Sequence, residues 1–305
     1  MSIPQFLIRF VIAALIILNS LFVQAQQRKV VKTGSHPSRA RTTMSPAERA
    51  SVDEAIIVVC SQAKLDPYGS LAIDEMQARP SIPIHHPEAV AGAARAQKLL
   101  PVAKTLVISS LTQLVKDYGL SKSAISNSRL QQATARVEAV TKVKPDMESR
   151  DNASVYLNRP RTITFGTLFL VGLRSDEGMI SVLCHELMHI ADGENDNLRV
   201  LVNAVAAKAS GLTGLEIHGQ RAEELTCDLI GAMAVRTFVG DSPGYESTAR
   251  RLARSVEHNC VDVDEGDEEH LSPRNTIRAL LALNPQLVRD LINDKAESPR
   301  PVKNE

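Results

Sequence analysis

The sequence predicts an α+β fold that is predominantly helical and contains a small antiparallel sheet. Three observations predict it. Most of the chain is rich in Ala and Leu, with apolar residues at helical spacing, and 44% of its 305 residues are hydrophobic, as in a globular protein. Two short segments rich in β-branched and aromatic residues follow Asn152, with a turn sequence between them. A helix start signal at Ser175 then precedes another apolar stretch.

Residues 1–25 have the pattern of a secretory signal peptide. A short basic start leads into an apolar stretch over residues 10–23, and Val23-Gln24-Ala25 fits a small-residue cleavage site. We therefore expect an exported protein, periplasmic or otherwise extracytoplasmic. An uncleaved anchor, which would tie the N-terminus to a membrane, is the alternative. Cleavage is favoured because Asn19 and Ser20 interrupt the stretch and leave it short for a bilayer core of about 30 Å.

Residues 26–44 are predicted to be a disordered linker, and residues 291–305 a disordered tail. The linker is polar, basic and rich in Ser, Thr and Gly, so it cannot bury enough apolar surface to offset the entropy of ordering it. Residues 45–150 are predicted to form a helical support region, which supplies scaffold rather than chemistry.

Capping signals and apolar spacing define the helices of this support region. Ser45, Pro46 and Glu48 have the types expected of an N-cap, a first-turn proline and a capping-box acid. Four prolines within residues 66–87 indicate a connection. The helices predicted in the region lie over residues 46–64, 87–118 and 128–143.

Four cysteines, Cys60, Cys184, Cys227 and Cys260, make an even set that an oxidising compartment allows to pair. Three pairings are open, and the sequence does not choose among them. One of the three joins Cys184 to Cys227, which adjoin candidate site residues, and Cys60 to Cys260.

The predicted secondary structure changes from helices to short strands after residue 150. Ala153–Leu157 and Arg161–Phe165, separated by Asn158-Arg159-Pro160, predict a strand, a turn and a second strand. Ser175, followed by two acids, then predicts a capped helix that runs through Leu187.

His185, Glu186 and His189 form an HExxH pattern inside this helix. Residues four apart on a helix are separated by about 40° around the axis and about 6 Å along it, so both imidazoles leave one face and can bind one Zn²⁺. Glu186 is placed to take a proton from a water molecule on that ion, which makes it the candidate catalytic base. The alternatives are two ordinary histidines, or a structural zinc that would need four protein ligands.

A hydrolytic zinc needs a third protein ligand, and Glu224 is the candidate. Glu224 and Asp228 share one face of a predicted helix. Asp228 can accept the free ring N–H of a ligand histidine and fix its tautomer. Glu223 is the alternative ligand. Without the HExxH pattern, these acids would be read as the solvated face of an amphipathic helix.

With these residues the sequence resembles the gluzincin metallopeptidases, and among them the family that includes the HtpX heat-shock protease and the CAAX prenyl protease. That family carries HExxH on one helix and ExxxD on a later one, matched here by His185, Glu186, His189, Glu224 and Asp228. Asn152-Ala153 and Arg161–Gly166 resemble the family's strands beside the metal. The resemblance covers about residues 150–285. It implies a zinc metallopeptidase domain over residues 151–290, built on a zincin-like active-site helix pair.

The resemblance implies a zinc-dependent endopeptidase of the cell envelope that acts on a peptide or protein substrate. Such enzymes pair an edge strand beside the metal with an extended substrate. The candidate strand is Asn152–Leu157, and an ordinary edge strand without a ligand is the alternative. The multiple membrane spans of HtpX and the prenyl protease have no counterpart in this sequence, so the resemblance does not extend to prenylated substrates.

The sequence departs from the family near its end. Many members carry a His-Pro pair followed by Arg, and the histidine is thought to reach the developing oxyanion. Here the matching stretch is Ser272-Pro273 with Arg278, so serine takes the place of the histidine. His270 is the candidate replacement, and Tyr245 and His218 are further candidate donors.

The charge of the chain argues against nucleic acid as a partner. Lys plus Arg and Asp plus Glu both number 35, so there is no global basic field. The acidic run Asp262–Glu269 is predicted to be a solvated loop, because its glycine is out of register for an EF-hand. A second class of function stays open, an envelope chaperone or assembly factor with a regulated or vestigial zinc site. Its client surface would be residues 66–87 and the helical support region.

Overall fold

Helices dominate the fold, and a small sheet lies beside them, which confirms the predicted predominantly helical α+β class. A computed structural model describes residues 43–120, 125, 127–156, 161–193, 198–242, 244, 246–261 and 265–294. The predicted signal peptide lies outside the described residues. The described elements, in chain order, are α2 (Pro46–Ala63), α3 (Ile73–Gln77), α4 (Pro87–Asp117), α5 (Asn127–Glu138), β1 (Lys142–Asp146), β2 (Ala153–Val155), β3 (Thr162–Gly166), α6 (Thr167–Gly172), α7 (Asp176–Asp192), α8 (Arg199–Thr213), α9 (Gln220–Asp241), α10 (Thr248–Ala253), the 3₁₀ turn η1 (Glu257–Asn259), α11 (Pro273–Leu283) and α12 (Pro285–Asp294).

The predicted start of α2 is confirmed. The Ser45 hydroxyl accepts a hydrogen bond from the Glu48 backbone N–H at 3.2 Å, and the Glu48 carboxylate accepts one from the Ser45 backbone N–H at 2.7 Å. This is the reciprocal capping box that the residue types indicate. Met44, at the end of the predicted linker, is buried, so the ordered fold begins before the predicted boundary at residue 45.

Helix α4 is the longest described helix and packs along α7 and α9. It continues through Pro101, which lies on its exposed side. Among the described helices α4 alone has the length and apolarity of a membrane span. Half of that apolar window is buried inside the fold, as in a core helix.

The sheet is mixed, so the prediction of an antiparallel sheet is wrong in this detail. Its order is β1-β3-β2, with β1 parallel and β2 antiparallel to the central strand β3. The predicted pair corresponds to β2 and β3. Strand β1 is the addition, and it takes over the end of the helix predicted over residues 128–143, which stops at Glu138. Pro145 lies within β1 at the edge of the sheet, where proline is tolerated.

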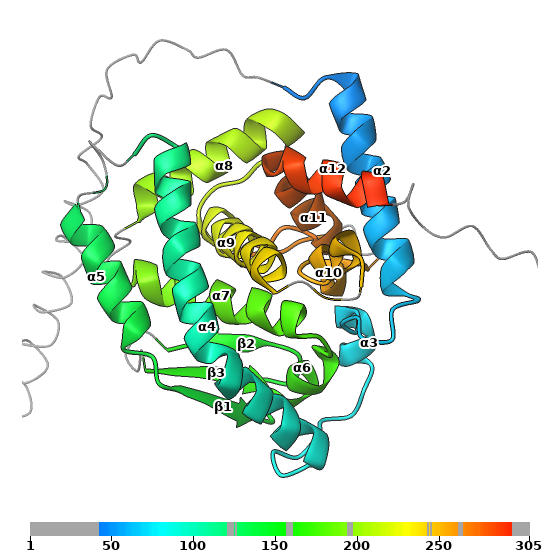
Figure 1. Cartoon of the computed structure of the whole chain (residues 1–305), viewed down its shortest axis with the longest axis vertical. Helices are drawn as coiled ribbons and strands as arrows, with labels where there is room; N and C mark the ends of the chain where they lie inside the picture. The colour runs from blue at the N-terminus through cyan, green and yellow to red at the C-terminus, as the bar shows by residue number, and fades with distance from the viewer. Residues whose placement is uncertain are drawn as a thin grey trace, which may run out of the picture. The chain divides into compact units, whose positions relative to one another are not determined.

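Helix α7 lies between the sheet and α9, and α4 packs against it as well (Figure 1). Because neighbours cover α7 on several sides, its apolar residues are buried all round rather than along one stripe. The largest fully buried side chains of this helix are Met179, Ile180, Leu183, Leu187 and Met188. The helix that carries HExxH is therefore part of the hydrophobic core.

Helices α7 and α9 cross in close contact. A Cβ atom on Gly231 of α9 would lie 2.7 Å from the carbonyl oxygen of Ser181 on α7, a distance at which one of the two helices would have to shift. Glycine is therefore required at this crossing. The short separation holds the first turns of α9 close to the second half of α7, where both motifs lie.

The structure decides between the cysteine pairings. Cys60 at the end of α2 forms a disulfide with Cys260 after η1, across a sequence separation of 200 residues. Cys184 and Cys227 are free, buried thiols, so the pairing between these two is wrong. Cys184 lies on α7 and Cys227 on α9, and both side chains are buried in the core.

The C-terminal boundary also needs correction. Helix α12 continues to Asp294, and Leu291 is fully buried, so residues 291–294 do not belong to the predicted disordered tail. An asparagine, an acid and a lysine follow Leu291 and Ile292, so composition alone does not mark where this helix ends.

Candidate metal centre

The two histidines of HExxH leave the same face of α7. The Ser175 hydroxyl begins the helix by accepting a hydrogen bond from the Gly178 backbone N–H at 3.0 Å. Gly193 ends it with a φ of 70°, in the left-handed region that favours glycine. Between these caps the rings of His185 and His189 lie with their centroids 5.0 Å apart, both mostly shielded from solvent.

Helix α9 brings three carboxylates to these rings. Glu223 and Glu224 lie in its first turns, and Asp228 follows one turn later on the face toward α7. The ExxxD residues therefore reach the HExxH residues although more than 30 positions separate them in the chain.

Three possible ligand groups, two imidazoles and one carboxylate, converge. The Nε2 atoms of His185 and His189 lie 3.2 Å apart. The Glu224 carboxylate lies 3.1 Å from the first of these nitrogens and 3.5 Å from the second. Ligands bound tetrahedrally to zinc at about 2.0–2.1 Å lie about 3.3–3.4 Å from one another. The separation of the two nitrogens is close to this value, and each nitrogen lies at a similar distance from one oxygen of the Glu224 carboxylate, Oε2 for His185 and Oε1 for His189.

The other nitrogen of each ring contacts a second carboxylate. Asp228 lies 2.8 Å from Nδ1 of His185, and Glu223 lies 3.0 Å from Nδ1 of His189. Carboxylates in these positions accept a hydrogen bond from Nδ1–H and direct Nε2 toward a metal. Glu223 thus lies behind His189 rather than among the converging atoms, which disfavours it as the alternative ligand.

The carboxylates control the protonation of the rings. Burial lowers the pKa of His185, but the charge of Asp228 and the hydrogen bonds to Asp228 and Glu224 outweigh it and raise that pKa well above its ordinary value. The pKa of His189 is raised in the same way, against burial, by Cys227, Glu223 and Glu224. Burial raises the pKa of Glu224, but its hydrogen bonds to both histidines reverse this and hold it well below the usual range. The cluster is therefore built to hold positive charge.

Glu186 lies next to His185 and is 5% exposed. Burial raises its pKa, although the two histidines act in the opposite direction. A buried carboxyl whose pKa lies above its ordinary value is a better proton acceptor than an exposed one, which suits the role of general base.

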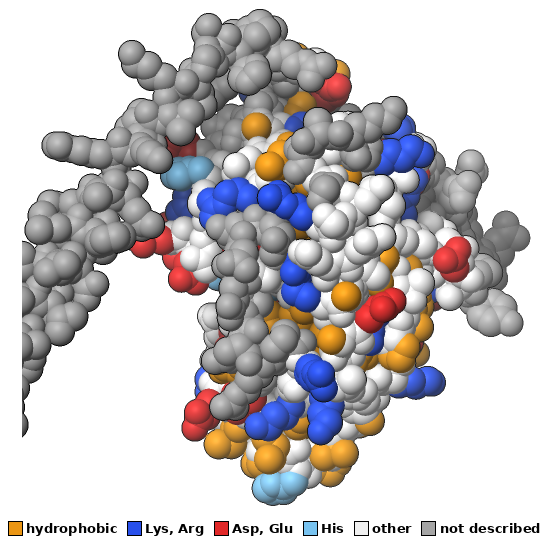
Figure 2. Space-filling model, turned by 90° about the vertical axis from the view of Figure 1, so that its left-hand side faces the viewer, with side chains coloured by type: hydrophobic (Ala, Val, Ile, Leu, Met, Phe, Trp, Pro, Cys, Tyr) orange, Lys and Arg blue, Asp and Glu red, His pale blue; other side chains and the backbone are white. Residues whose placement is uncertain are grey.

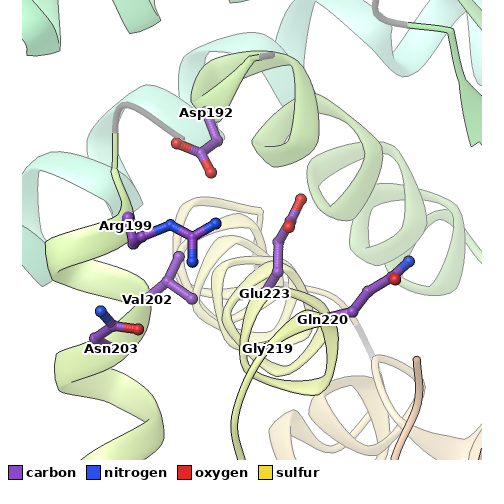
Figure 3. Close-up of a pocket in the computed structure, with 7 residues that line it drawn as sticks. All are labelled: Asp192, Arg199, Val202, Asn203, Gly219, Gln220 and Glu223. Atoms are coloured by element: carbon purple, nitrogen blue, oxygen red, sulfur yellow. The ribbon is translucent and has the colours of Figure 1, made fainter. Parts of the chain in front are cut away.

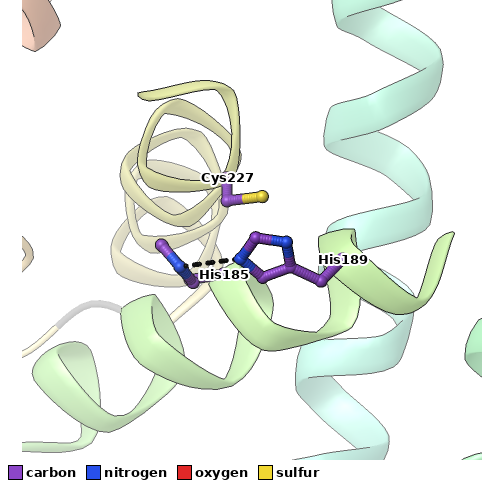
Figure 4. A group of neighbouring side chains, drawn as sticks. All are labelled: His185, His189 and Cys227. Carbon is purple, nitrogen blue, oxygen red and sulfur yellow. Dashed lines mark hydrogen bonds between the residues drawn. The ribbon is translucent and has the colours of Figure 1, made fainter. Parts of the chain in front are cut away.

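Two residues near the site were not predicted from the sequence. Cys227 lies on α9, three residues after Glu224, and Figure 4 shows its side chain over the ring of His189. Its helical spacing from Glu224 could have identified it. His258 comes from η1, and burial lowers its pKa to about 4; His185 acts in the same direction and Asp228 in the opposite one. Nothing in the sequence around His258 links it to the motif.

The remaining predicted residues have different outcomes. His270 lies at the edge of the site, with Nε2 3.8 Å from the Glu224 carboxylate and its side chain 54% exposed. His218 is exposed in the segment before α9. Ser272 is buried and caps α11, with its hydroxyl accepting from the Asn275 backbone N–H at 3.4 Å. Arg278 lies 3.7 Å from Asp53. Tyr245 lies outside the described residues.

A pocket of about 250 Å³ opens beside the cluster, between the end of α7, the start of α8 and the start of α9. Figure 3 shows the Arg199 side chain extending from α8 between Asp192 and Glu223. Because Glu223 also contacts His189, the pocket and the converging atoms share a wall. The site therefore has a polar recess next to it that could hold part of a ligand.

Comparison of the chain with protein-family models, with curated proteins and with solved structures finds no match.

Proposed function

We propose that the protein is a zinc-dependent endopeptidase of the cell envelope. The observation that carries the proposal is the convergence of His185 Nε2, His189 Nε2 and the Glu224 carboxylate at mutual distances of 3.1–3.5 Å. Two imidazoles and one carboxylate are a ligand set that catalytic zinc uses when one position is open to water or substrate. The gluzincin resemblance leads to the same activity.

The charges around the site support a bound cation. Three carboxylates surround two imidazoles in a mostly buried place, and burying several carboxylates without a compensating charge is costly. In the absence of metal, protons on the histidines compensate, as their raised pKa values indicate. A zinc ion, when bound, would polarise a peptide carbonyl and lower the pKa of a water molecule toward about 7.

Glu186 supplies the proton transfer. It lies on α7 beside His185, and burial, which raises its pKa, makes it a stronger acceptor for a proton from the attacking water. The same carboxyl then passes that proton to the leaving amine. His270, at the edge of the site and half exposed, is the proposed donor to the oxyanion that forms during hydrolysis.

The sheet provides a place for an extended substrate. Strand β2 is at one end of the β1-β3-β2 order, and within the described residues it pairs with β3 alone. It also packs against α7, the helix that carries HExxH. A peptide added to the outer edge of β2 would therefore run alongside that helix, and backbone hydrogen bonds would bind it with little dependence on its sequence.

Export is part of the proposal. It is motivated by the signal-like residues 1–25, and the Cys60–Cys260 disulfide is of the kind that persists in oxidising compartments.

The test compares wild type with Glu186→Gln. We expect the purified wild type to cleave casein and to lose this activity with a zinc chelator. The variant should retain one zinc per chain but lose cleavage by about 10²–10⁴-fold, because only the proton acceptor is removed. Zinc content by elemental analysis and the cleavage rate are the two measurements.

Two outcomes would contradict the proposal. Normal turnover by Glu186→Gln would remove the assigned base. Absence of chelator-sensitive cleavage, together with binding of unfolded envelope proteins that Glu186→Gln leaves unchanged, would favour the chaperone instead.

A further inference from the structure

A buried thiol lies within reach of the candidate metal centre. Cys227 is 1% exposed, and its Sγ atom lies within 4.8 Å of a ring nitrogen of His185 and one of His189. The other free thiol, Cys184, faces away from the site, because its Sγ lies 3.5 Å from the carbonyl oxygen of Ala103 on α4. Of the two free cysteines, only Cys227 belongs to the cluster.

The position of Cys227 on α9 makes it a neighbour of Glu224. Residues three apart on a helix lie on the same face, so both side chains are directed toward α7. In Figure 4 the thiol lies above the ring of His189, beside the hydrogen-bonded pair of imidazoles. One ligand atom from each of His185, His189 and Cys227 therefore lies within 4.8 Å of the other two.

Thiolate changes the chemistry of a zinc site. It is a softer donor than water, and zinc bound by four protein ligands has no position left for substrate. Two imidazoles, the Glu224 carboxylate and a Cys227 thiolate would form such a closed set. A site with only the first three would be open.

We propose that Cys227 is a fourth metal ligand that closes the site in the resting protein, so that hydrolysis requires the thiol to leave. This inference depends on the proposed function. When the sulfur–metal bond forms, the S–H bond breaks, its proton passes to bulk solvent, and one water molecule is released from the site. The reverse exchange takes up one proton and one water, and it reopens the position that substrate needs.

Cobalt reports directly on this ligand. We would load the full mature chain with Co²⁺ alone and record its absorption spectrum, since thiolate bound to Co²⁺ gives an intense near-ultraviolet charge-transfer band that nitrogen and oxygen donors do not give. Three variants accompany the wild type. Cys227→Ala removes the proposed ligand, Cys227→Ser retains its size in case alanine impairs folding, and Cys184→Ala removes the other buried thiol as a matched control.

We expect one Co²⁺ per chain with the band in wild type and Cys184→Ala. Both Cys227 variants should bind one Co²⁺ without the band. Their affinity for zinc, measured in competition with a chelator, should be at least about tenfold lower than that of wild type, because a residue of the metal site is lost. Their rate of casein cleavage should exceed that of wild type, because the fourth position is open.

Wild type that binds one Co²⁺ without the band would overturn the proposal for Cys227 and leave the three-ligand endopeptidase intact. A band that persists in both Cys227 variants would also overturn it. Failure of wild type to bind Co²⁺ or Zn²⁺ would overturn both this inference and the proposed function.

Discussion

At the scale of single residues, each histidine of the cluster has its own carboxylate on the nitrogen that faces away from the proposed metal. Asp228 holds His185 and Glu223 holds His189, at 2.8 and 3.0 Å. Such partners hold the Nδ1–H, so that Nε2 is the nitrogen that can bind a metal once its own proton has left. The ring orientation therefore does not depend on the metal being bound first.

Replacement of Asp228 tests this role. We expect Asp228→Ala to weaken zinc binding by about 10–100-fold, because the His185 ring loses the acceptor that orients it. Asp228→Asn keeps an accepting oxygen in place and should recover part of the affinity. Asp241→Asn, at the exposed end of the same helix, is the control. Zinc competition against a chromophoric chelator measures all three, and equal affinity for Asp228→Ala and wild type would show that Asp228 has no positioning role.

A second residue-scale prediction concerns Glu257, outside the metal centre. Its carboxylate accepts a hydrogen bond from the Ser70 backbone N–H at 2.5 Å, close to the buried ion pair between Arg254 and Asp66. Burial raises the pKa of Glu257 to about 7. The folded chain therefore binds this proton more tightly than the unfolded chain does. The contribution to stability is complete below about pH 4.5 and is lost as pH rises through 7.

Glu257→Gln should remove this pH dependence while keeping an oxygen for Ser70. Between pH 4.5 and pH 8, the free energy of unfolding of wild type should fall relative to the variant by up to roughly 3 kcal/mol. Urea denaturation at several pH values measures it, with Glu75→Gln, an exposed acid of α3, as the control. Parallel pH profiles for wild type and Glu257→Gln would mean that this carboxyl is not buried in a protonated form.

At the scale of elements, the site depends on the crossing of α7 and α9. Gly231 allows the two helices to approach at Ser181, and the carboxylates of α9 can reach the histidines because the helices are this close. Small residues at helix crossings permit such short separations, and an added side chain forces the backbones apart.

Gly231→Ala should therefore impair both stability and the site. We expect a loss of about 1–3 kcal/mol in the free energy of unfolding, together with weaker zinc binding, because the new methyl group meets the Ser181 carbonyl oxygen. Gly240→Ala lies on the same helix, with open space around its Cβ position. That control should be neutral or slightly stabilising, since alanine favours helix. Unchanged zinc affinity in Gly231→Ala would show that zinc binding does not depend on the close approach of α7 and α9.

The elements show which features a sequence reveals and which it does not. Local signals were sufficient for α2, whose capping box is formed by residues three apart, and for the start of α7 at Ser175. Strand β1 was missed because its partner β3 lies about 20 residues away, and a short polar strand has no periodicity that distinguishes it from the end of a helix.

The site shows the same division. Motif spacing was sufficient to select the residues that the structure brings together, because helical periodicity places His185 with His189 and Glu224 with Asp228. No local sequence signal indicates that the two helices pack against each other. Which carboxylate contacts which ring nitrogen, and the approach of Cys227, depend on how α9 is rotated against α7.

At the scale of the whole molecule, acidic and basic side chains are equal in number and are mixed on the visible face. Figure 2 shows basic side chains spread over the visible face with acidic ones among them, and hydrophobic side chains gathered at its lower end. Exposed large hydrophobic residues include Ile84 and Val90, near the start of α4.

The disulfide links parts of the fold that are distant in sequence. Because Cys60 and Cys260 are 200 residues apart, their bond restricts the unfolded chain strongly, and Cys60→Ser with Cys260→Ser should lower the free energy of unfolding by about 2–5 kcal/mol. Zinc affinity should change little, since neither cysteine contacts the cluster. Urea denaturation and zinc competition measure the two effects, and unchanged stability would show that the bond does not form in the folded protein.

The most direct test of the metal centre is anomalous X-ray diffraction at the zinc edge, from crystals of the mature protein grown with zinc. We predict one strong peak at bonding distance from Nε2 of His185, Nε2 of His189 and the Glu224 carboxylate. A peak at other residues, or no peak with these three side chains turned away from one another, would contradict the proposed centre and the hydrolysis that depends on it.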